Sequence, residues 1–177
     1  MTSKLKTDVL ETVSGSGTIA LTNQLSGMTS ASMPSGSVVQ VVNAKTSTLV
    51  ITTTNSFINT GLTATITPTS TSSKILILLS QNGIQLQGDN SANDISIALF
   101  KASTQISLLS LELGYTGSTQ HMTPATISTS YLDSPSTTNA TAYKTMFRNV
   151  DGGAAGGSVR TQNTSCESTI TLIEIKG

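Results

Sequence analysis

The stretch LTATITPTSTSSKILILLS, residues 62–80, decides the fold that this sequence predicts. In its first part, Leu62, Ala64 and Ile66 alternate with threonines, which is the period of a strand with one buried and one solvated face. After Pro68 and a polar run, residues 75–79 are all apolar, a length that suits a strand covered on both faces. The two strands are expected to pair as a hairpin at the centre of a two-layer β structure.

Similar short segments recur along the chain, separated by Gly, Pro, Asn and Ser. Their regular spacing is typical of an antiparallel sandwich or jelly roll. In the last segment, Ile170 and Leu172 are followed by Ile173 and Ile175, and this change of phase predicts a bulge or burial of both faces. We therefore expect an all-β protein, an antiparallel β-sandwich or jelly roll. The further strands are expected at residues 37–44, 47–54, 94–101, 105–113, 126–133, 140–150, 159–163 and 168–176.

The composition excludes several classes of protein. Nine basic and nine acidic residues give a net charge of zero, and no basic patch that could neutralise phosphates is visible, so nucleic acid is not an expected partner. No apolar run approaches the roughly 18 residues of a membrane span. The apolar residues, 36% of the chain, are gathered in short alternating runs, which argues against disorder. The only cysteine, Cys166, excludes an internal disulfide.

The first 37 residues differ from the rest in their glycine content. Their apolar residues are too few and too scattered to enclose a core, and ordering the backbone costs about 1–2 kcal/mol per residue. We expect residues 1–37 to form an extended arm that is covered by a larger assembly, and residues 38–177 to form the β-sandwich head. The candidate contacts of the arm are Ile19, Leu21, Leu25, Met28 and Met33.

The sequence offers no constellation of catalytic residues. His121 is the only histidine, and no Asp or Glu lies within six residues of it on either side. Cys166 is expected to be a partly buried packing residue. The oxygen-rich segment around Asp89 and Asp94 has the groups that calcium prefers, but its spacing does not match an EF-hand, so ordinary turn chemistry is expected there. We expect no enzyme activity, no cofactor and no metal site.

Five segments carry a resemblance to a known family: residues 19–42, 62–80, 131–135 (YLDSP), 143–148 (YKTMFR) and 168–176. Together they resemble a family of fibre and surface proteins of tailed bacteriophages, particularly those of marine and cyanobacterial hosts. The resemblance implies a homotrimeric component of the virion surface, made in the host cytoplasm, whose N-terminal arm binds tail or capsid proteins. It brings no catalytic residues, and it makes a host-surface glycan a further candidate partner.

Many relatives in that family have shaft repeats between arm and head, and this chain has almost none. The resemblance therefore favours a short tail fibre or spike, with a capsid decoration protein that stabilises the head shell as the alternative. Strands that are apolar on both faces suit a trimer, and the candidate interface residues are Ile75, Ile77, Leu79, Ile173 and Ile175. Candidate receptor-binding residues, in the loops 82–93 and 114–124, are Asp89, Asn90, Tyr115 and His121.

Overall fold

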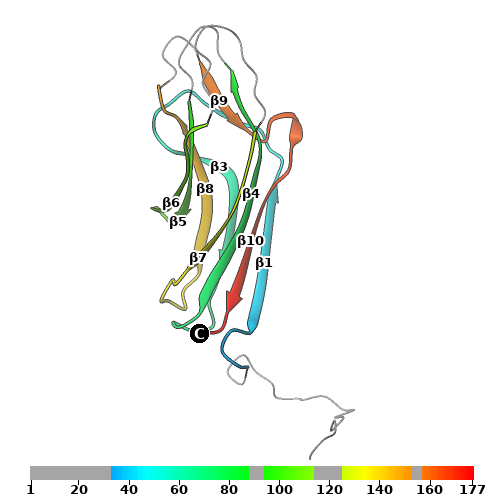
Figure 1. The fold of residues 1–177 in the computed structure, drawn as a ribbon, viewed down its shortest axis with the longest axis vertical. Helices are drawn as coiled ribbons and strands as arrows, with labels where there is room; N and C mark the ends of the chain where they lie inside the picture. The colour runs from blue at the N-terminus through cyan, green and yellow to red at the C-terminus, as the bar shows by residue number, and fades with distance from the viewer. Residues whose placement is uncertain (1–32, 88–93, 114–124, 153–156) are drawn as a thin grey trace, which may run out of the picture. The chain divides into compact units, whose positions relative to one another are not determined.

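The computed structural model describes residues 33–87, 94–113, 125–152 and 157–177, which contain ten strands and no α-helix (Figure 1). The predicted all-β class is confirmed. The strands are β1 (Val38–Thr46), β2 (Val50–Thr52), β3 (Ile58–Ile66), β4 (Lys74–Gln87), β5 (Ile95–Lys101), β6 (Thr104–Leu113), β7 (Ala125–Asp133), β8 (Thr141–Asn149), β9 (Ser158–Thr161) and β10 (Ser168–Ile175), with a short 3₁₀ turn, η3 (Asn163–Ser165), before the last strand.

The strands form two antiparallel sheets that pack as a sandwich. One sheet has the order β1-β10-β4-β9-β2, with β7 also paired to β4, and the other has the order β3-β8-β5-β6. Four of the pairings are nested in sequence: β5 pairs with β6, β4 with β7, β3 with β8, and β1 with β10. Rolling such a nested hairpin into two sheets gives the jelly-roll order, with β2 and β9 as an addition at one end.

The expected hairpin of β3 and β4 is wrong, because the two strands lie in different sheets. Residues 67–73, which include a turn in which Ser73 N donates to Ser70 O at 3.2 Å, connect the two sheets and not two strands of one hairpin. The reason is that both strands direct an apolar series into the same interior, where they meet across the sandwich and not side by side. Those series are Leu62, Ala64 and Ile66 from β3 and Ile75, Ile77 and Leu79 from β4.

The last strand, β10, contains no bulge. Its register with β4 is continuous from Thr169 to Ile175. The inward positions are Ile170, Leu172 and Glu174, each 0% exposed, while Ile173 and Ile175 lie half-buried on the outer face. The change of phase in the sequence therefore arises because a buried glutamate occupies an inward position, which apolar periodicity alone does not detect.

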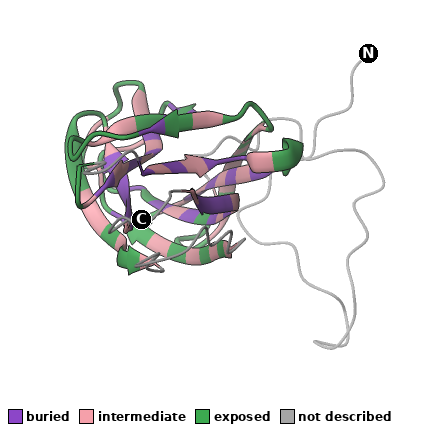
Figure 2. Cartoon of the chain, turned by 90° about the horizontal axis from the view of Figure 1, so that it is seen from above, coloured by how far each residue is buried: buried purple, intermediate pink, exposed green. Residues whose placement is uncertain are grey.

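A buried polar layer divides the interior into two apolar clusters. The hydroxyl oxygens of Thr60 and Thr145 are 2.5 Å apart, and Thr145 Oγ1 donates to Gln81 Oε1 at 2.8 Å. Gln81 Nε2 donates to Ser168 Oγ at 3.1 Å. All four residues are 0% exposed, and they come from β3, β8, β4 and β10. Since buried polar groups are stable only with partners, this layer fixes the register of one sheet on the other. Figure 2 shows the buried positions alternating with less buried ones along the strands.

Gly83 lies within β4, whose first part pairs with β10 and β7 and whose last part pairs with β9. The register between β4 and β7 shifts between Gln81 and Ile84, and Gly83 has a φ of +60°. A Cβ at this position would lie 2.6 Å from the backbone nitrogen of Asn163, so only glycine fits. Beyond this point β4 continues to Gln87 and pairs with β9. The loop that was predicted to begin at residue 82 is therefore strand up to Gln87.

Candidate functional site: an apolar patch on the larger sheet

One row of side chains across the larger sheet is apolar on its outer face. The strand registers place Val41 beside Ile173, Ile173 beside Leu76, and Leu76 beside Leu132. Val41 is 57% exposed and Leu132 is 51% exposed, while the two central residues are half-buried between them. This row draws on β1, β10, β4 and β7, so the four strands together make a continuous apolar strip.

Neighbouring side chains widen the row into a patch. Val38 pairs with Ile175 on one side of the row, and Leu78, 42% exposed, lies on the other. Beyond them the same face is polar, because its next positions along the strands are Ser, Thr, Asn and Lys. We call the following residues the apolar patch: Val38, Val41, Leu76, Leu78, Leu132, Ile173 and Ile175.

Three of the predicted interface residues lie on the wrong face. Ile75, Ile77 and Leu79 are 0%, 1% and 4% exposed and belong to the core of the chain itself. Leu76 and Leu78, which lie between them along β4, point outward instead. In a run of five apolar residues the period cannot show which positions face inward, so the sequence alone could not show that these three residues belong to the core. The other two predicted residues, Ile173 and Ile175, do lie in the apolar patch.

Of the remaining predicted positions, two lie within the described residues and the others lie outside them. Met33 is described and half-buried, and its carbonyl oxygen accepts a hydrogen bond from Lys176 Nζ. Cys166, expected to be a partly buried packing residue, is exposed beside an open hollow of about 420 Å³. The other arm residues, Ile19, Leu21, Leu25 and Met28, and all four candidate receptor residues, Asp89, Asn90, Tyr115 and His121, lie outside the described residues.

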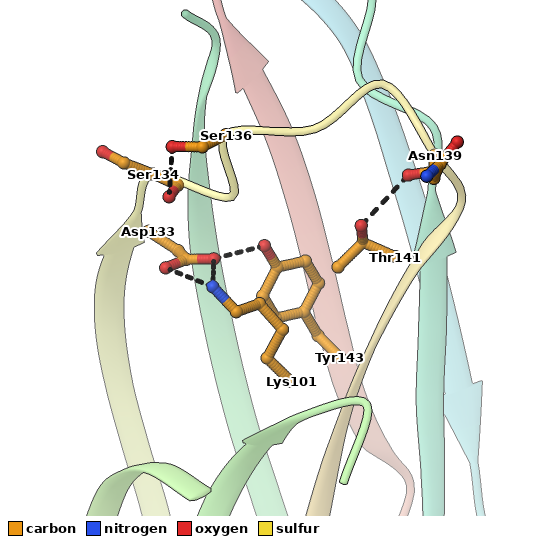
Figure 3. A network of polar contacts seen from close by, with 7 residues as sticks. All are labelled: Lys101, Asp133, Ser134, Ser136, Asn139, Thr141 and Tyr143. Carbon is orange, nitrogen blue, oxygen red and sulfur yellow. Dashed lines mark hydrogen bonds and ion pairs between the residues drawn. The ribbon is translucent and has the colours of Figure 1, made fainter. Parts of the chain in front are cut away.

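A polar cluster joins the edge strand β7 to the opposite sheet (Figure 3). Lys101 Nζ lies 3.0 and 3.2 Å from the two carboxylate oxygens of Asp133, and Tyr143 Oη donates to Asp133 Oδ2 at 2.6 Å. Tyr143 is 0% exposed, and burial, reinforced by the bond to Asp133, raises the pKa of its phenol, which therefore stays a neutral donor. The segments YLDSP and YKTMFR thus meet in a structural contact between the sheets.

A second carboxylate is buried where the chain crosses between the sheets. Glu174 Oε1 accepts hydrogen bonds from the backbone nitrogen of Thr69 at 2.7 Å, from Thr69 Oγ1 at 2.7 Å and from Ser73 Oγ at 2.6 Å. Glu174 Oε2 accepts from Gln40 Nε2 at 2.6 Å. Burial raises the pKa of Glu174, but these hydrogen bonds to its charged form outweigh burial and leave the pKa lowered. The sequence signal for this site was a single acid inside an apolar strand.

The carboxylates of Asp133 and Glu174 are held by hydrogen bonds, and in the case of Asp133 by an ion pair, to other groups of the chain. Among the described residues, no group of three or more His, Cys, Asp or Glu is placed to hold a metal ion. Within the same ranges, no helix has the length and apolar content of a membrane span. The apolar patch is therefore the feature of this surface that is best suited to a partner.

Comparisons with known proteins place the chain in no family. No family model matches it, and no curated protein matches it. A solved structure with some likeness is the dimeric latent PorU of Porphyromonas gingivalis, with a TM-score of 0.31 and 10% sequence identity. The likeness covers 81% of this chain and 14% of that one. A likeness of this size carries no argument about the present chain.

Proposed function

We propose that this protein is a structural component of a bacteriophage virion: a short, trimeric tail fibre or spike that is anchored by its N-terminal arm and presents its β-sandwich for attachment to the host surface. The observation that carries the proposal is the apolar patch. Its seven aliphatic side chains gather on one face, and three of them, Val38, Val41 and Leu132, are more than half exposed. Contiguous apolar surface of this kind marks a place where a protein is covered by a partner.

The position of the patch supports an anchored module. Val38 begins β1 and Ile175 ends β10, so the patch reaches the end of the sheet where the chain enters the sandwich. At that end Gly36 N donates to Lys176 O at 2.8 Å, and Lys176 N donates to Ser37 O at 2.9 Å. Met33, where the described part of the chain begins, accepts a hydrogen bond from Lys176 at this same end of the sheet, and this position suits a head that is anchored there.

Locating the chain on phage particles tests this proposal. Antibodies raised against the recombinant chain, coupled to gold, would be applied to tailed-phage particles whose genome encodes it, and viewed by electron microscopy. Label at the tail supports the fibre or spike. Label distributed over the head would support the decoration protein instead. Particles that carry no label, although an antibody against the major capsid protein labels them, would refute a place on the virion surface.

A further inference from the structure

We infer that the outer edge of β7 is a binding site for an extended polypeptide segment of a partner protein, which pairs with β7 as a further strand of the larger sheet. The site is the row of backbone N–H and C=O groups, over residues 127–133, on the side of β7 that faces away from β4. It differs from the apolar patch, which consists of side chains on the outer face of the sheet.

The other outer strands carry the features by which proteins protect a sheet edge, namely short length, bulges and lysines. In the described ranges, the outer strands of the two sheets are β1, β2, β3, β6 and β7. β2 has only three residues. β6 shifts register with β5 at three places, and β3 shifts register with β8 between Asn59 and Thr63, so bulges bend both edges. β1 shifts register after Val38 and carries Lys45 near its end.

β7 has none of these protections. Its residues 127–133 pair one for one with residues 81–75 of β4, without a register shift. The strand, ATISTSYLD, contains no Lys, Arg, Pro or Gly, and its one charged residue, Asp133, is buried against Lys101. Seven residues of regular strand extend over about 24 Å, because each residue adds about 3.4 Å. β7 therefore offers a regular, uncharged edge on which another chain can form a ladder of hydrogen bonds.

The contacts of Asp133 hold this edge in place before any partner binds. Lys101 Nζ lies 3.0 Å from Asp133 Oδ2, and Tyr143 Oη donates to the same oxygen at 2.6 Å. Both partners belong to the opposite sheet, so the end of β7 is attached to both layers of the sandwich. Since β7 is already ordered, only the incoming segment loses conformational freedom on binding.

The side chains of β7 define the chemistry of the incoming segment, because paired residues of neighbouring strands project from the same face of a sheet. On the inner face, Ile127 and Tyr131 are half-buried and pack against the two core clusters, so the residues paired with them should be apolar. On the outer face, Ser128 and Ser130 are exposed, which suits hydroxyl residues beside them. The expected occupant is an uncharged segment in which apolar residues alternate with Ser or Thr.

A second copy of β7 is not the expected occupant. Two identical edges that pair with one another make a two-fold contact. The trimer of the proposed function has three-fold symmetry and contains no such contact. This step alone rests on the proposed function.

A synthetic peptide tests the site in the full-length chain. The probe has the sequence LTATIT of residues 62–67, which alternates as the site requires, and carries a fluorescein label. The control peptide, LIATTT, has the same composition without the alternation. Fluorescence polarisation should show that the probe binds at least about 10-fold more tightly than the control, because only the probe places its apolar side chains together on the inner face.

Hydrogen exchange locates the bound probe on the chain. A saturating concentration of the probe should slow exchange at least about 10-fold for those amides of residues 127–133 that face away from β4. The amides of the protected outer strands β3 and β6 should exchange at unchanged rates.

Substitutions at Thr129 provide a matched test. Thr129 is half-buried on the inner face of β7, so in Thr129→Lys an added strand would bury a charge, which is one of the ways in which natural edges prevent pairing. We expect Thr129→Lys to weaken binding of the probe at least about 10-fold, and Thr129→Val, which keeps a β-branched side chain, to change it less than about 3-fold. Thr65→Lys adds the same charge at an exposed position of β3 and should leave binding unchanged. Circular dichroism confirms that each variant is folded.

Three results would overturn the inference: equal affinity for the two peptides, protection by the probe outside β7, or a two-fold dimer of the wild type that protects residues 127–133 without a peptide. The third result would make a second copy the occupant of the edge. None of them decides whether the chain lies on a virion, which the gold label tests separately. If the probe binds at β7 and the particles carry no label, the proposed function fails and the strand-binding site remains.

Discussion

Replacing Glu174 by Gln should destabilise the sandwich, because this carboxylate holds the connection between the two sheets. Its Oε1 accepts three hydrogen bonds from Thr69 and Ser73, and its Oε2 accepts one from Gln40. In Glu174→Gln, one oxygen can keep the three donors, but the new amide nitrogen faces Gln40 Nε2, another donor. Gln40 could turn its amide oxygen toward the new nitrogen only by losing its own bond of 2.8 Å to the carbonyl oxygen of Thr67.

The size of the effect follows from these contacts. One hydrogen bond to a charged group, worth about 1.5–3 kcal/mol, is lost, and three others lose their charge assistance. The easier burial of a neutral side chain offsets part of this loss. We therefore expect the free energy of unfolding to fall by about 2–4 kcal/mol at pH 7, a large share of the 5–15 kcal/mol typical of domains.

The lowered pKa of Glu174 determines how the loss of stability in Glu174→Gln varies with pH. Because hydrogen bonding lowers the folded pKa of Glu174, its stabilisation is fully present above the unfolded pKa and is lost as the pH falls through the lower folded value. The difference between wild type and Glu174→Gln should thus be largest at pH 7 and shrink below about pH 4. Urea unfolding, monitored by circular dichroism at one fixed protein concentration, measures this difference.

Glu167→Gln is the matched control for this substitution. Glu167 is exposed and forms a surface ion pair of 3.0 Å with Lys45, so its replacement should change the free energy of unfolding by less than about 0.5 kcal/mol. The reasoning would be refuted if Glu174→Gln were as mild as this control at pH 7, or if its effect were the same at pH 7 and pH 3.5.

Three further substitutions test other contacts. Tyr143→Phe removes a hydrogen bond to a buried carboxylate and should cost about 1.5–3 kcal/mol in urea unfolding, whereas Tyr131→Phe should cost less than about 0.5 kcal/mol. Gly83→Ala should cost at least about 2 kcal/mol, since strain at a φ of +60° adds to a backbone clash. Gly152→Ala, with a φ of +67° but only an ordinary contact of 3.7 Å to Asn55 Cβ, should cost about 1 kcal/mol, and equal losses would contradict the clash. Asp94→Asn should raise the melting temperature at pH 7, because burial, together with nearby carboxylates, raises the pKa of Asp94. The contribution of Asp94 to stability is therefore present at low pH and is lost as the pH rises through its raised folded pKa. A gain in melting temperature that persists at pH 3 would refute this.

The sequence predicted the positions of the strands better than it predicted which strands pair with one another. Alternation located β7 and β8 almost to the residue, and Tyr143, Thr145 and Phe147 do share one buried face of β8. The alternation of apolar and polar residues, however, shows only that a strand has one buried face. It does not show which sheet the strand enters, and so it could not distinguish a hairpin from the crossing of β3 and β4 between sheets.

The apolar patch was accessible to sequence reasoning only in part. Ile173 and Ile175 could be recognised because they break the alternation of β10. Val41 and Leu132 could not, because the next outward residue toward the middle of each strand is polar, Asn43 after Val41 and Ser130 before Leu132. They become part of a patch through cross-strand pairing between segments that are far apart in the chain, and a linear pattern does not contain that register.

The nested order of the strands also governs when the chain can fold as it leaves the ribosome. The hairpin of β5 and β6 can close as soon as it is made, but β3 must wait for β8, and β1 has no neighbour until β10, the final strand, has been synthesised. Such distant pairings make for slow folding, on the scale of milliseconds to seconds. Translation that stops before β10 would leave β1 and β4 with bare edges at the centre of the larger sheet, so prematurely terminated chains should aggregate or be degraded rather than assemble.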